Sequence, residues 1–175
     1  MTTPTEWKTE ITRIMHWKQI AAKHDKYHAL SWNIPRVCAK PEEIVEAETR
    51  IGVPFSTQFK ELLLLMNGWK GFYILIDLFG TEDFLAGRST KIWERPEIKE
   101  YIIHSGFSTN DIIPIGASDA ELDVFLLVSP RSTKGAGTVL WWAGEEIDRF
   151  PTFRDFFSAM VNYNAQVANK LGQRT

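Results

Sequence analysis

The 175-residue chain lacks the cysteines that build disulfides and thiolate metal clusters, and it lacks the long apolar run of a membrane segment. Its single cysteine, Cys38, excludes an intrachain disulfide and a thiolate metal cluster. The first ten residues, MTTPTEWKTE, lack the basic start and apolar run of a secretory signal. No segment approaches the roughly 20 consecutive apolar residues that span a bilayer. These absences predict a protein of the reducing cytoplasm.

The chain also lacks a strong excess of either positive or negative charge. The formal net charge is −2, which provides no broad field for nucleic acid or for an anionic membrane, so we expect neither as a partner. The hydrophobic fraction of 44% and charged fraction of 24% are those of an ordinary globular protein. At this length we expect a single domain over residues 1–175, with a sizeable buried core.

Catalytic motifs are missing as well. His24 and His28 are four residues apart, a spacing that can place two imidazoles on one metal, but no glutamate follows His24 as in H-E-x-x-H. The segment from Gly116 to Ser118 resembles the start of the G-x-S-x-G nucleophile elbow, yet the last glycine is absent and the segment leads into a predicted strand. We therefore expect no catalytic residues, no metal and no cofactor.

Aromatic residues are abundant, with seven Trp and eleven Phe, and we expect most of them in the core. Helix-start signals and apolar periodicity predict helices from Thr3 to about Tyr27, from Pro41, from Ser56, over residues 94–105 and from about Pro151. Alternating or continuous apolar runs predict strands over residues 73–79, 111–115, 122–128 and 138–142. We further expect Asn67-Gly68 to end the third helix through positive φ angles.

This order of elements indicates the fold class. Helices come first, consecutive strands follow, and one long helix closes the chain. Such an order predicts an α+β domain. We expect a central, mostly antiparallel sheet with the N-terminal helices and the C-terminal helix packed on it.

Residues 51–68, IGVPFSTQFKELLLLMNG, carry a more specific pattern. The stretch resembles the signature of the SUKH superfamily, in which an Ile/Leu-Gly step, an aromatic residue, a Leu-rich helix and Asn-Gly follow in this order. Phe55-Ser56 replaces the usual Leu-Pro, and serine can cap a helix as well. The matching structural positions are Ile51, Gly52, Phe59, Leu62, Leu63, Asn67 and Gly68, with a later Ile-Gly step at Ile115 and Gly116. The resemblance covers residues 41–164 as a family-like core and leaves residues 1–40 outside.

The resemblance implies a function by binding. The superfamily includes a fungal cell-wall-synthesis regulator and many bacterial toxin-immunity proteins. It implies a non-catalytic module, an immunity protein that neutralises a cognate polymorphic toxin such as a nuclease or another effector domain. Two alternatives remain open: a regulatory scaffold of a signalling or cell-wall pathway, and a small metal-dependent hydrolase that uses His24 and His28.

Acidic loops beside two tryptophans are the candidate contact surface. Many toxins that attack nucleic acid are basic, so acidic residues would speed their encounter, and a few buried aromatic residues would supply affinity. Neighbouring residues of a strand point to opposite faces, so we expect one of the two tryptophans to be partly exposed. The candidates are Asp119, Glu121 and Asp123 in one loop, Glu145, Glu146 and Asp148 in the other, and Trp141 and Trp142 on the strand between.

Overall fold

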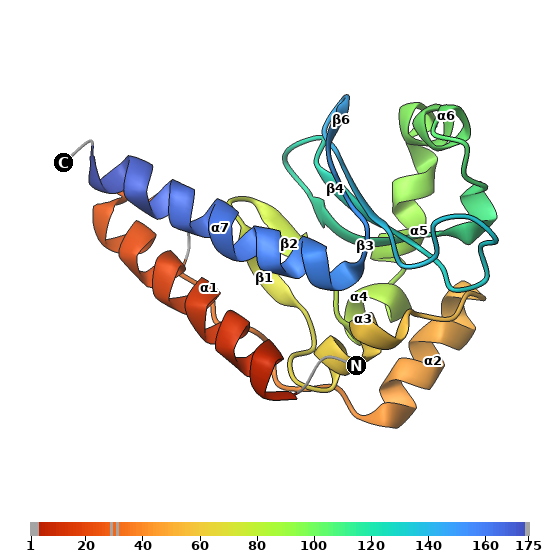
Figure 1. Ribbon diagram of the computed structural model, residues 1–175, viewed down its shortest axis with the longest axis horizontal. Helices are drawn as coiled ribbons and strands as arrows, with labels where there is room; N and C mark the ends of the chain where they lie inside the picture. The colour runs from red at the N-terminus through yellow and green to blue at the C-terminus, as the bar shows by residue number, and fades with distance from the viewer. Residues whose placement is uncertain (1–3, 29, 31, 174–175) are drawn as a thin grey trace.

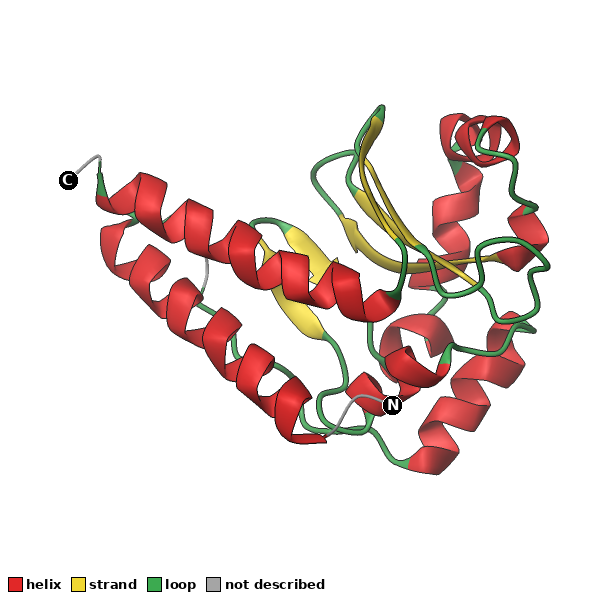
Figure 2. Ribbon diagram, viewed as in Figure 1, coloured by secondary structure: helices red, strands yellow, loops and turns green. Residues whose placement is uncertain are grey.

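The computed structural model describes residues 4–28, 30 and 32–173. Within them, six strands form one sheet in which every strand pairs antiparallel with the next along the chain (Figures 1 and 2). The strands are β1 (Trp69–Tyr73), β2 (Ile76–Leu78), β3 (Ile112–Ser118), β4 (Val124–Val128), β5 (Val139–Trp142) and β6 (Glu146–Phe150). This meander, preceded and closed by helices, confirms the α+β fold with an antiparallel sheet.

Helices cover both faces of the sheet. They are α1 (Pro4–His24), α2 (Pro41–Ile51), α3 (Thr57–Leu63), α4 (Thr81–Leu85), α5 (Arg88–Lys91), α6 (Pro96–His104) and α7 (Phe153–Gly172), with 3-10 turns η1 (Ile92–Glu94) and η2 (Thr109–Asp111). Figure 1 shows α1 and α7 side by side on one side of the sheet and α5 and α6 on the other. This double cover explains why every residue of β4 is buried.

The core lies between the sheet and the helix α7. Thr152 caps α7 by accepting the Asp155 backbone N–H at its side-chain oxygen, as the sequence predicts. The aromatic face of α7 then meets the sheet and α1: the Phe156 ring lies 4.9 Å from that of Phe125 in β4, and the Phe157 ring lies 5.4 Å from that of Trp7 in α1. Edge-to-face contacts of this kind add to the energy of burying the rings.

The Asn67-Gly68 pair does not end a helix, and that expectation is wrong. The helix α3 ends at Leu63, whereas Asn67 lies further on and ties two turns together. Its side-chain oxygen accepts the Thr81 backbone N–H at 2.7 Å, and its side-chain nitrogen donates to the Thr81 hydroxyl at 2.8 Å. Gly68 has φ +83°, and a Cβ there would lie 2.5 Å from the Gly80 nitrogen. The pair therefore permits a close approach of two backbone segments.

Two further boundaries differ from expectation. Residues 73–79 do not form one strand, because the chain turns at Ile74, which has φ +51°, and divides β1 from β2. The alternation of side chains that predicted a strand continues across this turn, so the sequence pattern does not reveal the turn. The first helix ends at His24 rather than near Tyr27, and its expected cap Thr3 lies outside the described residues. The strand β6 was not predicted, because its sequence EIDRF is largely polar.

Candidate functional site

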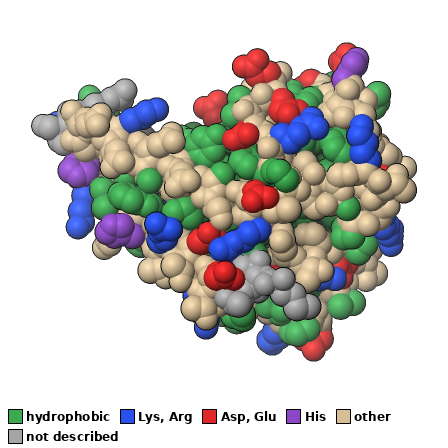
Figure 3. Space-filling model, viewed as in Figure 1, with side chains coloured by type: hydrophobic (Ala, Val, Ile, Leu, Met, Phe, Trp, Pro, Cys, Tyr) green, Lys and Arg blue, Asp and Glu red, His purple; other side chains and the backbone are tan. Residues whose placement is uncertain are grey.

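The structure brings both acidic loops to one end of the sheet. In an antiparallel meander, alternate turns lie at the same end, so the β3–β4 turn with Asp119 and Glu121 lies beside the β5–β6 turn with Glu145. The side chain of Leu122 approaches to 3.7 Å from where a Cβ on Gly144 would be. Figure 3 shows acidic side chains at the upper edge over the β6 end of the sheet, with basic side chains next to some of them.

Several of the predicted acidic candidates are bound by their own chain. Both carboxylate oxygens of Asp119 accept from Arg88 at 3.0 Å, although the Asp119 side chain is 85% exposed. Asp123 accepts the indole N–H of Trp141 at 2.8 Å. Asp148 accepts the hydroxyl of Tyr163 at 2.9 Å. These carboxylates are partly satisfied before any partner arrives.

Glu146 is the most firmly held of these carboxylates. It accepts two hydrogen bonds from Arg149, at 2.9 and 2.7 Å, and one from the Tyr101 hydroxyl at 2.5 Å. The bond from Arg149 lowers the pKa of Glu146, with a further contribution from Tyr101. Burial and the neighbouring Glu146 carboxylate raise the pKa of Tyr101 above its ordinary range. Opposite shifts of this kind mark a structural charge-assisted pair.

Both tryptophans are buried, so the expectation that one is partly exposed is wrong. Trp141 is 6% exposed and Trp142 is 4% exposed. They do point to opposite faces of β5, but each face is covered. The Trp141 ring lies 5.2 Å from that of Tyr163 in α7, and the Trp142 ring lies 6.2 Å from that of Tyr101 in α6. Helices on both sides leave no exposed face for either ring.

What remains at this end of the sheet is a smaller surface, which we call the acidic tip: Glu121, Leu122, Glu145 and Ile147. Glu121 and Glu145 are exposed, and neither side chain has an ion pair among the described residues. Leu122 is 52% exposed and Ile147 is 43% exposed. Two free carboxylates beside two exposed aliphatic side chains form a small surface suited to protein contact.

An ionic network around Arg88 anchors α4 and α5 to the sheet at β2. One nitrogen of Arg88 donates to Asp83 at 2.9 Å and to Asp77 of β2 at 3.0 Å, and Arg36 also bonds Asp83. Burial opposes ionisation of Asp83, but hydrogen bonds from the Gly80 backbone and both arginines outweigh it and lower the pKa of Asp83. The shift reflects a structural role.

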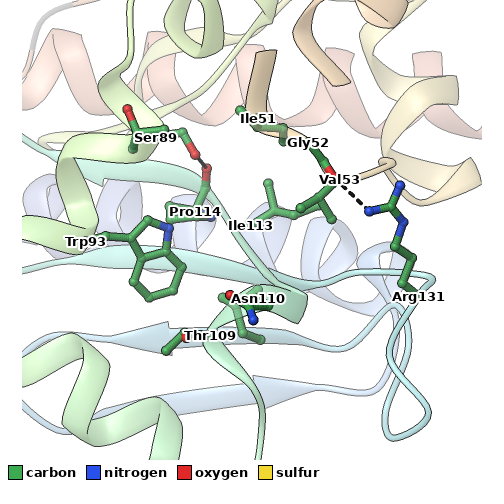
Figure 4. Close-up of a pocket in the computed structure, with 12 residues that line it drawn as sticks. Ile51, Gly52, Val53, Ser89, Trp93, Thr109, Asn110, Ile113, Pro114 and Arg131 are labelled. Carbon is green, nitrogen blue, oxygen red and sulfur yellow. Dashed lines mark hydrogen bonds between the residues drawn. The ribbon is translucent and has the colours of Figure 1, made fainter. Parts of the chain in front are cut away.

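A cavity of about 400 Å³ opens on the other side of α5 (Figure 4). It lies between the end of α2, the helix α5 with η1, and the start of β3, and the loop after β4 reaches it from one side. Its volume is within the range of ligand pockets. The lining residues are Ile51, Gly52, Val53, Ser89, Thr90, Trp93, Thr109, Asn110, Ile112, Ile113, Pro114 and Arg131. We call this cavity the α2–β3 groove.

The groove combines uncharged polar groups with one cation. Arg131 is the charged side chain that lines it, and one guanidinium nitrogen donates to the Gly52 carbonyl at 2.7 Å. Ser89 donates its hydroxyl to the Pro114 carbonyl at 2.8 Å. In Figure 4, Trp93 and Arg131 lie on opposite sides of the view, with Ile113 between them. The groove can therefore offer an aromatic wall, hydroxyl groups and a positive charge to one ligand.

Sequence reasoning missed this groove as a site. Its residues come from four separate segments, none of which shows a chemical motif. Two of the lining residues, Ile51 and Gly52, belong to the sequence signature described above. Gly52 has φ +74° and ends α2 in the left-handed conformation. That signature marked a helix end, and only the folded chain places the helix end against β3.

A metal site is not assembled where the two histidines suggested one. The helix α1 ends at His24, and His28 follows it with φ +51°, so the pair does not share a helical face. Among the described residues, no group of three or more His, Cys, Asp or Glu side chains could hold a metal ion.

A membrane span needs a long and apolar helix. Of the helices in the described ranges 4–28, 30 and 32–173, none combines the length and apolar character needed to cross a membrane.

Comparison with protein-family models matches residues 38–159 to the SMI1 / KNR4 family (SUKH-1). The matched range begins before α2 and ends inside α7, so it includes the whole sheet, the acidic tip and the groove. A search of curated protein sequences found no match.

Proposed function

The chain belongs to the SMI1/KNR4 family (SUKH-1), and on this premise we propose that it is an immunity protein, which binds a cognate polymorphic toxin and keeps it inactive. Family membership supports a non-catalytic immunity or regulator-like role, and it is the observation that carries the proposal. The toxin would be a nuclease or another effector domain that acts in the cytoplasm, where the immunity protein would meet it.

The electrostatics of the molecule agree with binding rather than catalysis. Perturbed pKa values are used as a guide to catalytic groups. Here, groups with shifted pKa values serve as structural partners: Asp83 accepts hydrogen bonds from two arginines, Tyr101 donates to Glu146, and Lys18 donates to the Gly71 carbonyl. Burial lowers the pKa of Lys18 to about 8, which accounts for its shift without a catalytic role.

The acidic tip is the surface we propose for toxin contact. Glu121 and Glu145 are exposed and unpaired within the described residues, so they can steer a basic toxin toward the sheet end. Leu122 and Ile147 are exposed near these turns and can be buried on contact. The remaining acidic candidates, Asp119 among them, would contribute to the negative potential near the tip while they stay bonded to donors of the same chain.

The experiment is a pull-down with the purified protein in lysate of its own source, followed by activity assays. The proposal predicts one stoichiometric partner with a toxin-like domain that is inactive in the complex and active alone. A Glu121→Lys, Glu145→Lys double variant should recover less of it. Capture of only signalling or envelope proteins would favour the regulatory scaffold, and stoichiometric zinc in the purified protein would favour the hydrolase.

A further inference from the structure

We propose that the α2–β3 groove is a carboxylate-binding site that receives an acidic segment of a protein partner, with Arg131 as the recognising cation. The inference rests on the proposed function only in taking the occupant to be part of a protein. It concerns a different surface from the acidic tip, because the groove is lined by the start of β3, whereas the tip lies at the turn that follows β3.

Charge selects the ligand class. Arg131 is the one lining residue of the groove that carries a charge, and no carboxylate among the described residues pairs with it. A guanidinium has five N–H donors in a planar fork that suits a carboxylate, and the bond to Gly52 engages one nitrogen. That bond also fixes the side chain in place before a ligand arrives, which reduces the entropy cost of binding.

Backbone pairing is disfavoured as the mode of recognition. The strand β2 pairs with residues Gly116–Ser118 only, so the outer edge of Ile112–Pro114 faces the groove without a partner strand. Yet Pro114 has no N–H, its carbonyl accepts from Ser89, and the N–H of Ile112 donates to Thr109. This edge therefore has few free backbone N–H and C=O groups with which an added strand could pair. Recognition therefore falls to side chains.

The wall of the groove suits a short segment of chain. Trp93 is half-buried and supplies a flat apolar face, while Asn110 and Thr90 are exposed and offer an amide and a hydroxyl. Arg131 and Trp93 lie on opposite sides of the groove in Figure 4. A carboxylate bound at Arg131 would thus leave the adjoining residues of the same segment against the indole ring.

Peptide titration followed by ¹⁵N NMR tests the inference without the natural partner. The probes are a capped pentapeptide with a central glutamate, its glutamine counterpart, and the glutamine peptide with a free C-terminal carboxylate. We expect the Trp93 indole and Asn110 side-chain amide signals to shift, with the glutamate peptide roughly tenfold tighter than its glutamine counterpart. Tighter binding of the third peptide would instead identify a chain terminus as the source of the carboxylate.

Two variants separate recognition from general charge. Arg131→Gln should abolish the preference for a carboxylate, whereas Lys134→Gln, a loss of the same charge in the same exposed loop but outside the groove, should leave it intact. Asn110→Trp should block the groove and remove the shifts with all three peptides. Equal affinity for the glutamate and glutamine peptides, an absence of shifts, or a preference that survives Arg131→Gln would overturn the inference. The pull-down outcome is independent of each of these results.

Discussion

The acidic tip, at the turn after β3, and the α2–β3 groove, at the start of β3, differ in how the chain uses charge. The acidic loops are rich in carboxylates, but four of them, including Asp119 and Glu146, bond to groups of the same chain. The groove is poor in charge, yet Arg131 in it has no carboxylate partner among the described residues. A charged loop in sequence therefore does not reveal which of its charges remain available to a partner.

The largest expected effect comes from the network that supports both regions. Asp83→Ala removes the carboxylate shared by Arg36 and Arg88, and it leaves Arg36 with the exposed Glu82 and Arg88 with Asp77 and Asp119. We expect the free energy of unfolding to fall by about 2–3 kcal/mol, as measured by urea denaturation. The control Glu82→Ala removes a carboxylate whose side chain is 77% exposed, and it should change stability by about 0.5 kcal/mol or less.

The loss of stability in Asp83→Ala should become smaller as the pH falls. The pKa of Asp83 in the folded protein is below the ordinary value of 3.8, so its contribution to stability is complete above that value and declines as the pH falls through the folded pKa. The stability difference between the wild type and Asp83→Ala should therefore narrow below pH about 4. A difference that stays constant down to pH about 2 would contradict the ionised role of Asp83.

The next effect should separate the groove from the tip. Gly52 has φ +74°, and a Cβ there would meet open space, so Gly52→Ala tests backbone strain without a clash. We expect a loss of about 1–2 kcal/mol in the free energy of unfolding. Gly52→Asn, which tolerates the left-handed region better, should lose less. In NMR spectra, Arg131 should respond to the change because it bonds the Gly52 carbonyl, whereas Glu145 at the tip should not.

Two adjacent glutamates offer a matched pair for the tip itself. Glu146→Ala removes hydrogen bonds to Tyr101 and Arg149 and should lower the free energy of unfolding by about 1 kcal/mol. Glu145→Ala removes an exposed carboxylate without an ion pair in the described part of the chain and should stay within about 0.5 kcal/mol of the wild type. Thermal or urea denaturation of both variants decides this. Equal losses would mean that the pairing of Glu146 is not what distinguishes it.

The smallest effect concerns association rather than stability. With the partner recovered by pull-down, Glu145→Lys should slow association by roughly threefold, an effect that high salt should weaken. Glu46→Lys makes the same change in net charge on the exposed side of α2 and should have a smaller effect. Stopped-flow or surface-binding kinetics at two salt concentrations measure the difference. Identical rates for the two variants would remove the tip from the proposed interface.

The local elements could be predicted where a capping group and an apolar stripe agree. Ser56 and Thr152 cap α3 and α7 as expected, and the Phe-rich face of α7 is buried. Prediction failed where the signal depends on distant partners. The strand β6 has a polar sequence and is held by pairing with β5, and Asn67-Gly68 acts through a contact with Gly80 and Thr81.

The candidate sites show the same division. The sequence placed Asp119, Glu121 and Glu145 in turns, but the expectation of a loop at Glu146 and Asp148 is wrong, because both lie in the strand β6. The internal partners of the acidic residues, such as Arg88 and Tyr101, come from segments far along the chain. The burial of both Trp141 and Trp142 follows from helices on both faces of β5, which no pattern within the strand reveals. The groove had no sequence signal of its own beyond the Ile51-Gly52 step.

The sequence by itself determined the family, the fold class and several helix starts, because these depend on apolar periodicity, caps and a short ordered signature. Only the tertiary structure decided which charges are satisfied and which remain available. Pairing of Asp119 with Arg88, and the isolation of Arg131 beside Gly52, depend on distances between segments that the fold brings together. Electrostatic energy depends on those distances and on burial, and neither is written in the order of residues.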